Sequence, residues 1–177
     1  MTYTDCDFWR TMLFKKLDEN GFNVQSVVSQ YGQHEGHSGM LVTQLVETNN
    51  LETWLDASNP DIVIMHFGTN DCWGNTGTKK ILDAYTKFVA QMRANNPNMI
   101  IVVAQIIPMH PSDQYDYKTI IEDLDTAMVD WANNLTTEES PIIPMSWNST
   151  IAPGSSITFG LQGVGTVTSD FEYNTIQ

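Results

Sequence analysis

The sequence predicts an α/β fold built on a parallel sheet, and three observations support this prediction. Short apolar runs, suited to strands, alternate along the chain with longer segments whose apolar residues recur at helical spacing. Two of the runs, 61–67 and 99–107, are almost entirely apolar, which is typical of strands buried on both faces of a parallel sheet. The 177 residues, of which 41% are hydrophobic and 16% charged, suit one packed domain.

The predicted elements alternate along most of the chain. Helices are placed where apolar residues form one stripe, as Ile81, Tyr85 and Phe88 do, and Gly or Pro residues mark their ends. The expected elements are a helix at 8–20, a strand at 23–29, a loop at 31–40, a helical region at 41–55 broken near 49–50, a strand at 61–67, a helix at 79–95, a strand at 99–107, a helix at 117–133 and a strand at 141–145. Active sites of open α/β sheets lie at the carboxyl ends of strands, so functional residues are expected after positions 29, 67 and 107.

The end of the chain has a different composition. Residues 146–177 are rich in Gly, Ser and Thr and carry no helical stripe. We therefore expect a catalytic-type domain at 1–145 and a divergent C-terminal segment at 146–177.

The charge balance narrows the class of partner. The formal net charge is -13, which disfavours nucleic acid, an anionic membrane or a polyanionic substrate and favours a neutral or weakly charged ligand. Acidity that serves only solubility explains the charge equally well. No apolar run approaches the roughly 20 residues that span a bilayer, and no signal peptide is visible.

Two short motifs lie where predicted strands end. Gly68-Thr69-Asn70-Asp71 directly follows the strand at 61–67, and His34-Glu35-Gly36-His37-Ser38-Gly39 follows the strand at 23–29. The first motif could be an ordinary turn that closes a strand. Two histidines and a Glu could also bind a metal ion, but no third ligand is obvious at that spacing.

In this order and on these elements, the motifs resemble blocks III and II of the SGNH (GDSL-type) hydrolases. The second motif is particularly similar to that of the acetyl xylan esterases of carbohydrate esterase family 3. Phe8-Trp9-Arg10, Pro60-Asp61-Ile62-Val63 and the segment 91–97 add to the resemblance, which covers roughly residues 2–145.

The resemblance implies a three-layer α/β/α sandwich with a flavodoxin-like parallel sheet, incomplete here because the family's first strand has no counterpart. It implies two-step ester hydrolysis by a Ser-His-Asp triad, with no metal or organic cofactor. The backbone N–H of Gly39 and the side-chain amide of Asn70 match the family's oxyanion donors, each of which can contribute about 3 kcal/mol to the barrier. The implied substrate is an acetyl ester on xylan or another polysaccharide, and intact members are typically secreted. Trp73, beside the block III motif, could stack on a sugar ring or simply pack.

The chain departs from the family at both catalytic blocks. The Gly-Asp-Ser motif of the nucleophile and the Asp-x-x-His motif of the base are not in place. We therefore expect weak or no esterase activity, and the alternative is a non-catalytic descendant or fragment that binds carbohydrate or a partner protein. Gly154-Ser155-Ser156 resembles a displaced block I, so either Ser156 is a nucleophile or this is a Ser-rich tail.

Other reactive side chains receive simpler interpretations. His110 could supply a base, because it follows a predicted strand, whereas His66 within the strand at 61–67 is expected to be a core histidine. Cys6 and Cys72 either pair as a disulfide or remain inert thiols.

Overall fold

The computed structural model of the 177-residue chain describes residues 9–27, 35–109, 112–146, 157–159 and 171–173. The chain divides into two compact units, Met1–Met145 and Ser146–Gln177. The elements in chain order are α1 (Trp9–Glu19), α2 (Val42–Leu45), α3 (Asn50–Ser58), β1 (Ile62–Met65), α4 (Thr69–Trp73), α5 (Thr78–Asn95), β2 (Ile100–Ala104), α6 (Tyr117–Leu135), β3 (Ile142–Met145), β4 (Ile157–Phe159) and β5 (Phe171–Tyr173). Among the residues described, no helix is long and apolar enough to cross a membrane.

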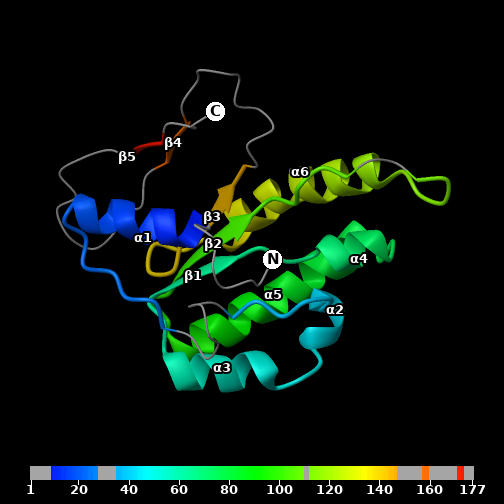
Figure 1. The fold of residues 1–177 in the computed structure, drawn as a ribbon. Coiled ribbons are helices and arrows are strands. Elements are labelled where there is room, and N and C mark those ends of the chain that lie inside the picture. The colour runs from blue at the N-terminus through cyan, green and yellow to red at the C-terminus, as the bar shows by residue number, and fades with distance from the viewer. Residues whose placement is uncertain (1–8, 28–34, 110–111, 147–156, 160–170, 174–177) are drawn as a thin grey trace. The chain divides into compact units, whose positions relative to one another are not determined.

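The first unit is built on a parallel sheet of order β1-β2-β3 (Figure 1). Ile62 of β1 pairs with Ile100 of β2, and Ile101 of β2 pairs with Ile142 of β3. Parallel neighbours need a crossover connection, and α4 with α5 provides the first while α6 provides the second. The sheet confirms the predicted α/β class, and the alternation of strands and helices that indicated it.

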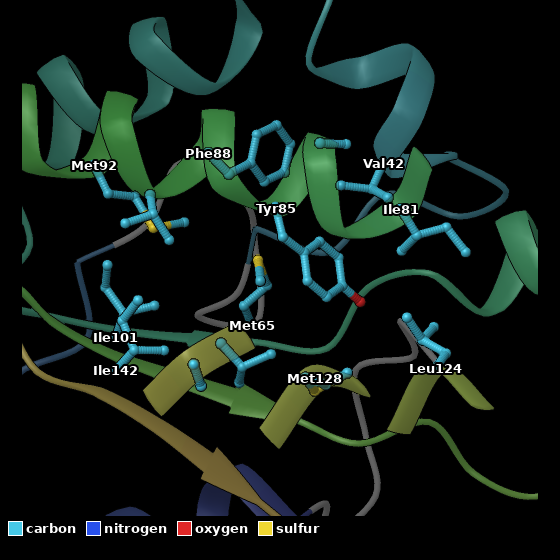
Figure 2. Packing of buried hydrophobic residues seen from close by; sticks show 14 of the residues in the cluster. Val42, Met65, Ile81, Tyr85, Phe88, Met92, Ile101, Leu124, Met128 and Ile142 are labelled. Carbon is cyan, nitrogen blue, oxygen red and sulfur yellow. The ribbon is translucent and has the colours of Figure 1, made fainter. Parts of the chain in front are cut away.

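One face of the sheet carries the hydrophobic core. Four strand residues on this face lie in one buried cluster with apolar side chains of α5 and α6. They are Met65 of β1, Ile101 and Val103 of β2, and Ile142 of β3. Figure 2 shows the α5 side chains Ile81, Tyr85, Phe88 and Met92 near those of the sheet and of α6. The fully or almost fully buried members of the cluster include Val42, Ile81, Tyr85, Phe88, Met92, Ile101, Val103, Ile121, Leu124 and Met128.

The opposite face is exposed along β1. Ile62 is 39% and Ile64 50% exposed, and His66 beyond them in the same register is exposed as well. The prediction of a strand buried on both faces is therefore wrong for β1. The reason is that a parallel strand is buried on both faces only where helices cover both, and this face of β1 is left uncovered.

The helices match the predictions closely, and the strands less so. The helical region at 41–55 does break, into α2 and α3. The strand predicted at 23–29 is wrong for its described part, because residues 22–27 have no regular structure and Val24 and Val27 are 43% and 44% exposed. In the second unit, β4 and β5 form an antiparallel pair that the sequence analysis did not predict.

Arg93, near the end of α5, makes a hydrogen-bond network at the amino ends of β2 and β3. Its Nη2 donates to the carbonyl oxygens of Leu135 (2.8 Å) and Ser140 (2.7 Å), and its Nε donates to the Ser140 hydroxyl (3.0 Å). That hydroxyl in turn donates to the Met99 carbonyl at 2.7 Å. The end of α5 is thereby fixed to the end of α6 and to the residues that precede β2 and β3.

Candidate active site

The site begins at the carboxyl end of β1, where Gly68 directs the chain into α4. Gly68 has φ +99°, and a Cβ at this position would lie 2.9 Å from the hydroxyl oxygen of Tyr85. The same hydroxyl, on α5, donates to the Phe67 carbonyl at 2.6 Å. Only glycine fits this conformation and this close approach, so the position of α4 is set by contact with α5.

Asn70 lies in the first turn of the short helix α4, and not in the tight turn that the sequence had indicated. Its Nδ2 donates to the backbone carbonyl of Met40 at 3.0 Å, across a separation of 30 residues. A side-chain amide has two N–H bonds, so this contact uses one and leaves the second for a ligand. The chain therefore brings Asn70 beside the residue that follows Gly39.

Gly39 has φ +77°, and no atom lies within 4 Å of the position that a Cβ would take. This backbone conformation favours glycine, and the space beside it is open. The two predicted oxyanion donors thus lie on segments that are in hydrogen-bond contact. Whether their N–H bonds converge on one oxygen stays a prediction.

Asp71 fixes the contact between the segment that carries Gly39 and the helix that carries Asn70. The sequence analysis gave Asp71 no role. The side chain is 0% exposed. Its carboxylate accepts hydrogen bonds from the backbone N–H of Val42 (2.8 Å) and of Thr43 (3.2 Å), and from the Thr43 hydroxyl (2.6 Å). It thus satisfies N–H groups at the start of α2 that have no partner within the helix. The sequence does show a carboxylate directly after Asn70. It does not show that this carboxylate contacts Val42, which lies 29 residues away.

Beneath the site lie three ionisable groups whose pKa values are raised by burial. Cys72 is a buried free thiol, and burial, followed by the charges of Asp71 and Asp125, raises its pKa to about 12. Burial likewise raises the pKa of the Tyr85 hydroxyl. Burial raises the pKa of Asp125 to about 6. The hydrogen bond that its carboxylate accepts from the Ile106 N–H, at 2.8 Å, acts in the opposite direction and lowers the pKa. Cys72 is therefore no nucleophile, and Cys6, its predicted partner, lies outside the described residues.

The two described histidines lie in different environments. His37 Nε2 lies 2.8 Å from Glu35 Oε1, and its ring stacks on Trp54 of α3 at 4.3 Å. The expectation that His66 is a core histidine is wrong, because its side chain is exposed at the uncovered face of β1. The desolvation that it does undergo still lowers its pKa.

His34, His110 and Ser156 fall outside the described residues. Within the part of the chain that is described, no group of three or more His, Cys, Asp or Glu side chains is arranged to hold a metal ion.

Comparison with known proteins gives a consistent result. Residues 3–151 match the model of the GDSL-like Lipase/Acylhydrolase family. A serine-to-alanine mutant of an acetyl esterase, solved with an acetate ion, is 30% identical with a TM-score of 0.68, over 78% of this chain and 72% of that one. A carbohydrate esterase family 3 protein from Talaromyces cellulolyticus is 28% identical with a TM-score of 0.68, over 83% and 79%.

A third solved structure supports the fold alone. The family 3 carbohydrate esterase of Clostridium thermocellum is 23% identical with a TM-score of 0.64, over 77% of this chain and 66% of that one. No curated protein sequence matches the chain.

Proposed function

Because the chain belongs to the GDSL-like lipase/acylhydrolase family and is an esterase by family, we propose that it acts on acetyl esters of a carbohydrate, with Asn70 and Gly39 as oxyanion donors. The observation that carries this proposal is the hydrogen bond from Asn70 Nδ2 to the carbonyl of Met40, the residue after Gly39. It joins the two segments that must cooperate.

The chemistry follows from where charge develops. Attack on an ester carbonyl turns its oxygen into an oxyanion, and fixed donors that meet this oxygen lower the barrier. Asn70 is held at a fixed position by Met40, and Asp71 next to it is locked onto α2. Donors that need no rearrangement are the more effective, because their orientation costs nothing during the reaction.

The acetyl group and the sugar are proposed from the similar proteins and from charge. The solved structures that resemble the chain include an acetyl esterase and a carbohydrate esterase. A neutral acetylated sugar also suits a chain of net charge -13, which would repel an anionic substrate.

The identity of the nucleophile separates an esterase from a binding protein. We expect slow hydrolysis from this sequence, because neither the Gly-Asp-Ser motif nor the Asp-x-x-His motif is in place and oxyanion donors alone supply only a small fraction of the rate. A fluorophosphonate probe separates the alternatives. It would label Ser156 if that serine is activated, and it would leave a pure binding protein unmodified.

The test compares Asn70→Ala with the intact chain in the hydrolysis of p-nitrophenyl acetate. Loss of one oxyanion donor should lower the rate above background by about 100-fold. Asn133→Ala is the matched control, because Asn133 is exposed in the last turn of α6. A rate that Asn70→Ala leaves unchanged would exclude Asn70 as a donor, and rapid turnover by the intact chain would refute the expectation of slow hydrolysis.

A further inference from the structure

We propose that Trp73, Tyr115 and Tyr117 form an aromatic platform on which a neutral pyranose ring of the substrate stacks beside Asn70. The inference rests on the proposed function, because it assigns a binding surface to the sugar part of the same substrate. It names a specificity surface that the oxyanion donors alone do not provide.

The exposed face of the aromatic platform is the Trp73 indole. This side chain is 61% exposed, the most of any large hydrophobic side chain among the described residues, whereas Tyr117 beneath it is only 8% exposed. The two ring centroids lie 5.8 Å apart at 40°, and the Tyr117 hydroxyl donates to the Trp73 carbonyl at 3.5 Å. A buried ring thus supports an exposed one, and the Trp73 indole offers a supported apolar surface to solvent.

The tyrosines of the platform are held by local hydrogen bonds. Tyr115 lies 5.9 Å from Tyr117, ring to ring. The Ser112 N–H donates to the Tyr115 carbonyl at 2.8 Å, and the Tyr115 N–H donates to the Ser112 hydroxyl at 3.1 Å. Asp116, between the tyrosines, caps α6 by accepting from the Thr119 N–H at 3.2 Å, and it also accepts from the Thr119 hydroxyl at 2.8 Å. A surface fixed before binding loses little entropy when a ligand arrives.

The platform lies next to the proposed oxyanion donor. Trp73 follows Asn70 by three residues on α4, a spacing that places Cβ atoms about 5–6 Å apart on a helix. Figure 1 shows α4 and the loop that precedes α6 at the same end of the sheet. A ring stacked on Trp73 would therefore carry an ester substituent toward Asn70.

The charges around the platform select the kind of ligand. Asp113 and Asp116 flank Tyr115 in sequence, and the whole chain has a net charge of -13. An acidic sugar would be repelled, whereas a neutral pyranose offers an apolar face of C–H groups that matches an indole. The geometry and charge together favour a neutral, O-acetylated pyranose.

The experiment follows the five tryptophan indole N–H signals of the ¹⁵N-labelled full chain by NMR while an O-acetylated xylo-oligosaccharide is added. The signal that disappears in Trp73→Ala identifies Trp73, and this signal should shift with the sugar. Trp73→Ala should weaken binding by about tenfold or more, and Trp73→Phe should weaken it less. Val129→Ala, which removes an exposed apolar side chain from α6, should bind normally.

Unchanged affinity in Trp73→Ala, or a response confined to another tryptophan, would overturn the platform. Equal binding of an oligosaccharide that carries a uronic acid would overturn the assignment to neutral sugars. The p-nitrophenyl acetate assay contains no sugar, so dependence on Asn70 there stands or falls separately from the sugar response. The two proposals can therefore fail independently.

Discussion

Asp71 illustrates how one buried carboxylate can organise the site without touching a substrate. It receives three hydrogen bonds from Val42 and Thr43, and its own neighbour Asn70 contacts Met40. The loop that carries Gly39 and the helix that carries Asn70 are thus joined twice within a few residues. Asp71 is a positioning residue for both predicted donors.

Asp71→Asn should therefore destabilise the chain and also reduce ester hydrolysis. The amide keeps the shape of the carboxylate but replaces one acceptor oxygen with a donor, which leaves a buried N–H or O–H group without its acceptor at a cost of about 1–3 kcal/mol. Urea denaturation followed by circular dichroism measures the loss. Asp83→Asn is the control, because that carboxylate is exposed and pairs only with Lys79 at the surface. A stability equal to that of the control would show that Asp71 does not hold α2.

Asp125 predicts a pH dependence of stability. Its pKa of about 6 in the folded chain lies above the ordinary value of 3.8, so folding favours the protonated form. This contribution is complete below about pH 4 and is lost as the pH rises through 6. The group is only half buried, so solvent screening limits the effect to about 1–2 kcal/mol.

Asp125→Asn should remove this dependence while its side-chain oxygen still accepts from Ile106. As the pH rises from 4 to 7, the unfolding free energy of the intact chain should fall relative to that of the variant. Thermal unfolding at several pH values provides the measurement, with the exposed Asp130→Asn on the same helix as control. A difference that does not change with pH would show that Asp125 titrates as it does in the unfolded chain.

At the scale of elements, the Arg93 contacts predict where the unit can be weakened. Arg93→Ala would leave the carbonyls of Leu135 and Ser140 without this donor, and the Ser140 residue is only 1% exposed. We expect a loss of about 2–4 kcal/mol in unfolding free energy, seen as a lower urea midpoint. Lys80→Ala, at the other end of α5 and exposed, should change it little. Equal midpoints for the two variants would contradict the role of Arg93.

The elements also show what a single sequence can and cannot predict. α5 and α6 were predicted within two residues at each end, because an apolar stripe is a property of the segment itself. The predictions of a strand at 23–29 and of burial on both faces of β1 were wrong, because a strand depends on its neighbours in the sheet and not on its own segment alone. The Gly-Thr-Asn-Asp motif indicated Asn70 because a motif is a property of the local sequence. The contact of Asn70 with Met40 and the role of Asp71 join segments far apart in the chain, so they needed the tertiary structure.

At the scale of the whole molecule, the dominant feature is an excess of negative charge. There are 21 acidic and 8 basic residues, and the described lysine–carboxylate pairs, such as Lys87 with Glu47, lie at the surface. Exposed pairs contribute little, so the remaining carboxylates repel one another across the folded chain more than in the expanded one.

Added salt should therefore stabilise the chain at neutral pH. Raising NaCl from 0.1 to 1 M shortens the Debye length from about 10 to about 3 Å, which screens the repulsion and should raise the melting temperature by a few degrees. The same series near pH 4.3, the sequence pI, is the internal control, because there the net charge is close to zero and the increment should nearly vanish. Calorimetry at both pH values decides the matter. A melting temperature that falls with salt at pH 7 would mean that the surface pairs outweigh the repulsion, and an equal rise at both pH values would assign the effect to the salting-out of apolar surface.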